Sequence, residues 1–499
     1  MQTQALEAKS SSTLTLLCIL IAVFVVPTSI SGTAIALPAI SASLHPQTAS
    51  LQWVVNAFNL TFASFTLAWG GLADVFGSKR TFVTGCILYF LASVLSWCAG
   101  NIYVLDAARA LAGIGGAAIF SCGSAILIQT FSGVKRTRAF ALFGTTAGLG
   151  ITFGPTLSGW LLGIAGWREI FLIHALSLFV VLILSTSVSG ASKKIDKLTF
   201  DFYGIVLFII ALFLIMSGIT QGAELGWTSN TTIIQLGLGC SVFLAFVVAE
   251  KKAASPVINF ALLGNQFFLS LILIPVVASF CFVTLLTWFP TWLIAVKNLS
   301  PVESGLVMLA LTAPVLVLPI IAGKLVTRGI PASFLLIVSL FLFVGGLGLL
   351  WIFSHDVMPL PRILLCLLLV GAGMGLSAGL VDGIALSAVE PQEVGRAAGI
   401  LNTFRLGSEA IAVAVYGSLM SGSISRFLSS QPTPEGMNAK QYLADVVSGS
   451  TPAAVRGDWF ESIYTLAFTH TLQVMLIIAL IISLSVIFML QNRSVGADH

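Results

Sequence analysis

The amino-acid sequence predicts an all-α membrane protein that crosses the bilayer fourteen times. Hydrophobic residues make up 57% of the 499 residues and charged residues only 8%, whereas a soluble domain averages about 25% charged residues. The apolar residues form long runs between polar breaks, each close to the roughly 20 residues that a spanning helix needs. The runs lack the alternating polarity of a membrane β-barrel, so helices are expected.

The spans are expected at regular intervals along the chain. The first six cover residues 14–37, 51–73, 82–98, 102–128, 139–163 and 170–187. Two more cover 202–220 and 233–249, and the last six cover 267–294, 304–326, 334–353, 363–387, 397–420 and 463–490.

A weak internal repeat divides these spans into two sets of six. A glycine-led basic turn follows the second span at 70–80, and a similar turn follows the tenth at 323–329. Repeated halves around a central site are typical of secondary transporters. We expect three domains: an N-terminal six-helix bundle in residues 1–190, two inserted linking helices in 191–264, and a C-terminal six-helix bundle in 265–499, with an external loop at 422–461. This loop either caps the outer mouth or is loosely ordered.

The positive charges predict the orientation. With both termini inside, 15 of the 23 Lys and Arg residues fall on the cytoplasmic side, in agreement with the positive-inside rule. We therefore expect a multi-pass protein of an inner or plasma membrane with both termini in the cytoplasm. The lipid bilayer is expected to surround the protein. The chain is expected to act as a monomer.

The fifth span carries an unusual number of small residues. Gly150, Gly154 and Gly159 recur at helical spacing with Pro155 among them, so a neighbouring helix can approach closely, and the proline favours a bend. One interpretation is a tightly packed helix pair, as in any membrane protein. The other is a pliable helix where two moving bundles meet.

Several kinds of chemistry find no support in the sequence. The seven cysteines lie in apolar runs and form no C-x-x-C pair, so neither a disulfide nor a metal site is expected. The string from Gly375 to Gly379 spells G-x-S-x-G inside an apolar span rather than on a strand–turn–helix elbow. No phosphate-binding G-x-x-x-x-G-K-[ST] string and no nucleic-acid motif occurs. We therefore expect no enzyme, no cofactor and no nucleic-acid partner, and an ion gradient as the energy source.

The ionisable candidates for positions deep in the membrane are few: Arg109, Asp382, Arg405 and Glu409, with His174 as a weaker candidate. Such groups are costly in a membrane, about 2.5 to 3.5 kcal/mol each, and indicate function by default. Glu409 lies near the middle of the thirteenth span and is the best candidate for a carboxyl group that binds and releases a proton, because burial disfavours its charged form. The alternative is a static ion pair with Arg405, four residues away on the same helix face.

Asp382 and Arg109 are secondary candidates for the proton route. Asp382 lies near the cytoplasmic end of the twelfth span, where we expect a hydrated carboxylate. Arg109 is either functional or a packing residue, and both readings stay open on the residues alone.

Four stretches, taken in their order along the chain, resemble the motifs of one family. They are Trp53 to Phe58, then Gly70, Asp74, Gly77, Lys79 and Arg80, then Leu105 to Ala117 around Arg109, and finally Gly150 to Gly159. With fourteen spans, the chain resembles the drug:proton antiporters with fourteen helices in the major facilitator superfamily. The resemblance implies the fold of that family, with two six-helix bundles plus two linking helices. It implies gating roles for the second and fourth stretches, with Asp74 either structural in gating or a substrate ligand. For Arg109 it implies proton transfer or bundle organisation.

The first span departs from the family pattern. Aligning back from Pro38 places Ser29 where the family usually has an aspartate and Ala34 where it has an asparagine. This departure affects both the usual proton site and the usual anchor for cationic drugs.

The sequence thus predicts a proton-coupled antiporter that exports amphipathic small molecules or drugs by alternating access, with Glu409, Asp382, Arg109 and Arg405 as the coupling residues. The alternative is a dedicated exporter of a single metabolite, with an anion among the candidates. A third class, a non-transporting sensor or channel, disagrees with the small-residue fifth span. Small-molecule substrate and protons are the expected partners.

Overall fold

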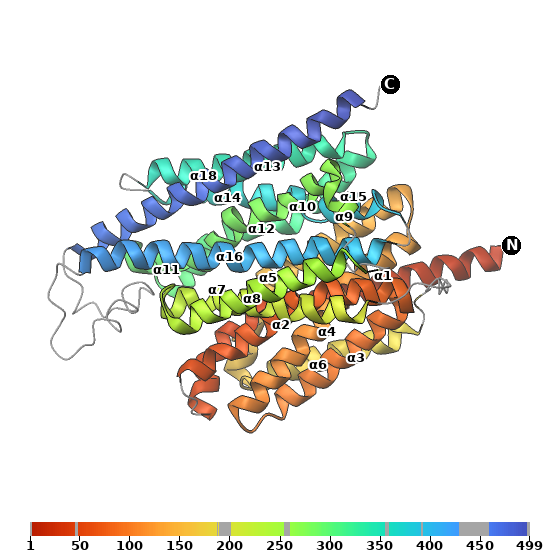
Figure 1. Ribbon diagram of the computed structural model, residues 1–499, viewed down its shortest axis with the longest axis horizontal. Helices are drawn as coiled ribbons and strands as arrows, with labels where there is room; N and C mark the ends of the chain where they lie inside the picture. Colours follow the sequence, from red (N-terminus) through yellow and green to blue (C-terminus); the bar gives the residue numbers. More distant parts are fainter. Residues whose placement is uncertain are drawn as a thin grey trace.

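Long helices that run roughly along one direction make up the computed structural model (Figure 1), which describes residues 2–44, 48–186, 188, 201–253, 260–354, 359–390, 393–428 and 459–496. Figure 1 shows that the first helix begins and the last helix ends at the same end of the molecule. We call this end the terminal side and the opposite end the distal side. Helices are expected of such apolar runs because lipid offers no partner for unpaired backbone groups.

Six helices form what we call the N half. They are α1 (Gln2–Leu44), α2 (Thr48–Phe76), α3 (Ser78–Trp97), α4 (Ile102–Thr130), α5 (Gly133–Ile164) and α6 (Arg168–Ser185). Contacts join α1 to α5 and α6, α2 to α4, and α3 to α4 and α6. Gly77, with φ +90°, separates α2 from α3, a backbone conformation that favours glycine. Asn101 begins α4 because its side chain accepts a hydrogen bond from the Val104 amide at 3.0 Å.

Two further helices, α7 (Phe202–Leu225) and α8 (Asn230–Glu250), pack against each other. The α7 helix also contacts both α2 and α16. Its Met216 is buried in one cluster with Leu60 and Ala63 of α2. The linking helices are therefore attached to both sets of six helices through α7.

The remaining elements form what we call the C half. They are α9 (Phe260–Gly264), α10 (Gln266–Ala278), η1 (Ser279–Val283), α11 (Thr284–Lys297), α12 (Pro301–Thr327), α13 (Ala332–Phe353), α14 (Leu360–Ser377), α15 (Leu380–Ser387), α16 (Val394–Leu428) and α18 (Trp459–Gly496). Contacts join α14 to α12 and α13, and α18 to α10 and α13. A capping box of Ser300 and Glu303 begins α12.

Each of the fourteen expected spans coincides with a helix or a broken helix, which confirms the all-α membrane fold. Two spans expected as continuous are interrupted. A π-helix, η1, lies between Pro275 and Pro290 in the ninth span. The twelfth span breaks at Gly379, whose φ of +78° ends α14 before α15 begins.

The expected external loop at 422–461 is also shorter than predicted. Helix α16 continues to Leu428 and α18 begins at Trp459, and the part of the predicted loop between them lies outside the described residues. The division into domains at residues 190 and 264 stays a prediction.

Twelve segments in the described part of the chain are long and apolar enough to cross a membrane. The helices α2 and α16 are long but fall outside this group, and they contact each other. Helix–helix interfaces in membranes favour small and polar residues over bulky apolar ones. The composition of α2 and α16 therefore fits helices that face protein more than lipid.

Candidate functional site

The N and C halves meet closely near the terminal side, where α2 ends and α16 begins. The Asp74 carboxylate accepts hydrogen bonds from the backbone amides of Gly395 and Arg396, both at 2.9 Å. These amides belong to the first turn of α16, whose free N–H groups and helix dipole favour an anion. No side chain fits between the helices here, because a Cβ on Gly70 would lie 2.9 Å from the carbonyl carbon of Gly395. Asp74 thus joins the two halves.

The other basic-turn residues predicted with Asp74 do not share this contact. The Lys79 ammonium is exposed and donates to the Thr186 carbonyl at 3.4 Å, within the N half. Arg80 is exposed as well. Of the predicted gating residues in this turn, Asp74 alone is placed by a described hydrogen bond against the C half.

The first half of α5 makes a second junction between the halves. A Cβ on Gly148 would lie 2.7 Å from the Val315 side chain of α12, and one on Gly144 would lie 2.9 Å from the Ala378 carbonyl carbon. At the start of α5, Arg136 donates to the Ser387 hydroxyl of α15 at 3.2 Å. This part of the fifth span therefore packs against the opposite half.

The glycines predicted for gating further along α5 face a different neighbour. A Cβ on Gly150 would lie 2.9 Å from the Phe24 carbonyl oxygen of α1, and one on Gly154 would lie 3.0 Å from the Thr28 Cα of the same helix. Pro155 lies within α5, and a Cβ on Gly159 would only touch Ile35 at 4.0 Å. The small-residue run thus has two functions in packing: its start meets the C half, and its centre meets α1 in its own half.

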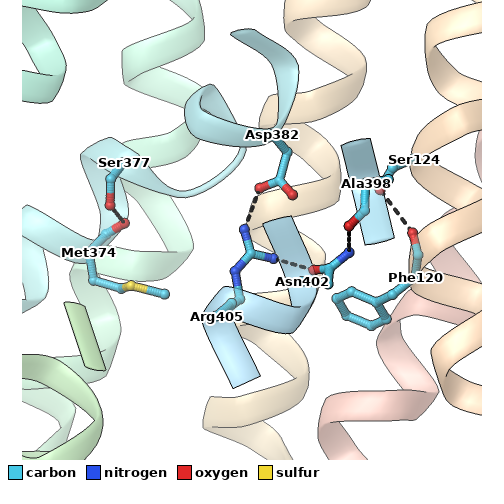
Figure 2. Close-up of polar contacts among 8 residues, drawn as sticks. All are labelled: Phe120, Ser124, Met374, Ser377, Asp382, Ala398, Asn402 and Arg405. Carbon is cyan, nitrogen blue, oxygen red and sulfur yellow. Dashed lines mark hydrogen bonds and ion pairs between the residues drawn. The ribbon is translucent and has the colours of Figure 1, made fainter. Parts of the chain in front are cut away.

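An ion pair lies within the C half, close to the junction with α4 and α5. Figure 2 shows Arg405 of α16 between Asp382 and Asn402. Its guanidinium is 2.8 Å from the Asp382 carboxylate and donates to the Asn402 amide oxygen at 3.0 Å. Asn402 in turn donates to the Ala398 carbonyl at 3.0 Å. Helix α16 also contacts α4, which carries the Phe120 and Ser124 seen in Figure 2.

This geometry corrects two expectations. Asp382 is not a hydrated carboxylate, because it is buried, with 3% of the residue exposed. It is buried because α15, set off by Gly379, packs against α4, α5 and α16. Arg405 is not in a static ion pair with Glu409, because its guanidinium turns to Asp382 instead. A buried carboxylate without a cation would be strongly destabilising, so the closer-packed acid takes the arginine.

Glu409 lies one turn beyond Arg405 on α16 and forms no hydrogen bond or ion pair with any described residue. At 100° per residue, Asn402, Ala412 and Tyr416 share its side of the helix, and their exposed fractions are 3%, 0% and 2%. Ile411, 42% exposed, lies on the opposite side. Glu409 therefore lies on the protein-facing side of α16, where it is partly buried.

Arg109 is a buried cation in the N half, with 1% of the residue exposed. Its Nε donates to the Val54 carbonyl at 3.0 Å and its Nη1 to the Ser29 hydroxyl at 2.7 Å. The guanidinium also lies 4.5 Å from the centre of the Phe58 ring, a cation–π contact. Among the described residues, no carboxylate pairs with it. Ser29, at the position where the family pattern has an aspartate, is thus its hydroxyl partner.

Some residues at these junctions were not singled out from the sequence. The spacing of Asn402 could have indicated its contact with Arg405, because it lies three residues before Arg405 on the same helix face. The Arg136–Ser387 contact joins residues 251 apart, and no local pattern indicates it. Among the described residues, no group of three or more His, Cys, Asp or Glu is placed to hold a metal ion.

Comparisons with known proteins agree on one family. A family model described as Major Facilitator Superfamily matches residues 19–413. The multidrug resistance protein Stp of Mycobacterium tuberculosis is 30% identical over 79% of this chain and 73% of its own length. The cephamycin export protein CmcT of Amycolatopsis lactamdurans is 30% identical over 83% of this chain and 87% of its own. The solved structure of the proton:xylose symporter XylE covers 92% of this chain and 95% of its own with a TM-score of 0.60 at 13% identity, which shows the shared fold.

Proposed function

Because the chain belongs to the Major Facilitator Superfamily, we propose that it exports amphipathic small molecules in exchange for protons by alternating access. It is a multi-pass membrane transporter and not an enzyme. Relatives named for multidrug resistance and for cephamycin export support export as the direction and a drug or antibiotic as the kind of substrate.

The junctions at the terminal side support alternating access. Three contacts hold the N and C halves together there. They are the hydrogen bonds of Asp74 to the first turn of α16, the packing of Gly148 against Val315, and the hydrogen bond from Arg136 to Ser387. The bias of Lys and Arg supports a cytoplasmic position for this side. In this arrangement the transporter is closed toward the cytoplasm, and the substrate enters from that side only after these contacts break.

The proposed proton coupling rests on the position and surroundings of Glu409. Its carboxyl lies on the protein-facing side of α16 and has neither an ion pair nor a hydrogen bond among the described residues. An acid held in this way can bind a proton in one state of the transporter and release it in the other. One proton moving inward across 100 mV contributes about 2.3 kcal/mol to export.

Glu409→Gln is expected to abolish transport driven by a pH gradient while downhill exchange continues, because the amide keeps the shape of the side chain but binds no proton. Purified protein in proteoliposomes would be tested with two fluorescent probes, the cation ethidium and the anion fluorescein. Glu303→Gln is the matched control, since Glu303 is an exposed acid at the start of α12. Full pH-driven transport in Glu409→Gln, or none in the wild type with either probe, contradicts the proposal.

A dedicated exporter of a single anionic metabolite is the second candidate, and the surroundings of Arg109 favour it. The guanidinium charge is met by the hydroxyl of Ser29 rather than by a carboxylate, so the N half keeps a positive charge inside the membrane. Positive potential attracts anions and repels cations. Competition separates the two candidates: unrelated cations that inhibit one another's transport indicate a multidrug pump, whereas transport of one anionic class alone indicates the dedicated exporter.

A further inference from the structure

Two acids lie within reach of one arginine in the C half. Arg405 is paired with Asp382 at 2.8 Å. Glu409 is four residues further along α16, a spacing at which side chains on a helix meet. It has no ion pair or hydrogen bond with a described residue. Arg405 can therefore satisfy either acid, and in this structure it satisfies Asp382.

The two acids belong to elements with different attachments. Glu409 shares α16 with the arginine. Asp382 lies on α15, an eight-residue helix that is set off from α14 by the left-handed backbone of Gly379. Helix α15 contacts α4 and α5 of the N half as well as α10 and α16 of its own half. The position of Asp382 therefore depends on the closure of the terminal side, whereas the distance along the chain between Arg405 and Glu409 does not.

We propose that Arg405 exchanges partners during transport, pairing with Asp382 while the terminal side is closed and with Glu409 when it opens. This inference deepens the proposed function and rests on it. In the closed state Glu409 is left without a cation and takes up a proton. On opening, α15 loses its contacts with the N half, and Arg405 turns to Glu409. An adjacent cation stabilises the ionised carboxylate, so the proton leaves Glu409 for water on the terminal side. Arg405 is thus a positioning residue for the proton.

Other charged groups lie on the helices that pack against α16. The charged or ionisable groups on helices that contact α16 include Asp74, Asp106, Arg109, Lys297, Glu461 and His470. Asp74 is bound to the first turn of α16, and Arg109 is bound to Val54 and Ser29. Arg405, one helical turn before Glu409, is the cation nearest to it along α16.

The experiment measures the proton itself and keeps the terminal side closed. A Cβ on Gly323 of α12 would lie 3.0 Å from the Ala141 Cβ of α5, so Ala141→Cys with Gly323→Cys is expected to form a disulfide between the halves. The carboxylic C=O band in infrared spectra of this locked protein is followed against pH. Each variant is measured with and without Glu409→Gln, and the difference isolates the Glu409 carboxyl.

In the locked protein, Asp382→Asn is expected to release Arg405 to Glu409. The pH at which Glu409 is half protonated then falls by about one unit, a tenfold loss of proton affinity. Adding Arg405→Gln to Asp382→Asn is expected to cancel this shift, and Arg405→Lys in its place to retain part of it. Glu390→Gln, which removes an exposed acid just beyond the same short helix, is the control and leaves the midpoint unchanged.

Two results would overturn the partner exchange. One is an unchanged midpoint in Asp382→Asn, and the other is a shift that persists after Arg405→Gln. Because the lock prevents opening, a shift of the midpoint cannot come from a change in the open population, and the Arg405→Gln variant separates partner exchange from a local structural effect. Failure of the proposed function would be distinct, since it appears as an absence of pH-driven transport by the unlocked wild type.

Discussion

An alanine at position 379 is expected to shift the transporter away from the state that is closed at the terminal side by about thirtyfold or more. Gly379 has φ +78°, a conformation that costs an ordinary residue about 1 to 3 kcal/mol. Its Cβ would also lie 2.9 Å from the carbonyl carbon of Phe140 on α5, and such overpacking costs about 1 to 3 kcal/mol more. Since about 1.4 kcal/mol is a factor of ten, the closed junction is expected to lose its dominance.

Thiol labelling measures this shift. Ala141→Cys lies at the α5–α12 junction, where the residue is 6% exposed in the closed state. The background carries Cys98→Ser and Cys240→Ser, because these two cysteines are exposed. Gly379→Ala should accelerate the reaction of this thiol with a maleimide. Gly345→Ala is the control, because a Cβ there meets no atom within 4 Å. Equal labelling rates in the two variants would refute the expectation.

The second large effect is expected from Asp74→Ala, which removes the anion from the first turn of α16. Its carboxylate accepts from two backbone amides at 2.9 Å, and a hydrogen bond to a charged group contributes about 1.5 to 3 kcal/mol. The closed state should therefore be weakened by tenfold to more than a hundredfold. Labelling of the thiol at position 141 should accelerate accordingly.

Two companions make this result specific. Asp74→Asn retains one acceptor oxygen without the charge and should give an intermediate labelling rate. Lys79→Gln changes a charge in the same turn, but its ammonium is exposed and reaches only Thr186 at 3.4 Å, so the rate should stay near that of the parent. If Lys79→Gln opened the junction as much as Asp74→Ala, the charge of the turn rather than the Asp74 hydrogen bonds would hold the halves together.

The sequence singled out the ionisable residues within the spans but did not indicate their partners. Arg405 and Glu409 share a helix face, so local spacing favoured their ion pair. The guanidinium instead pairs with Asp382, 23 residues away, on a helix that folds back beside α16. Likewise, the break at Gly379 lies in a run of continuous apolar residues, and its positive φ coincides with a close approach of Phe140 on a distant helix. Neither feature has a local signal.

The sequence by itself determined that the chain forms about fourteen membrane helices, because lipid leaves a backbone no other way to satisfy its hydrogen bonds over long apolar runs. It also determined that few ionisable groups lie within these helices, since each is costly there. Only the tertiary structure decided that Asp74 meets the start of α16, that Ser29 meets Arg109, and that Asp382 takes Arg405 from Glu409. The physical reason is that such pairs depend on how each helix is rotated and how it crosses its neighbours, and this is set by packing over the whole bundle.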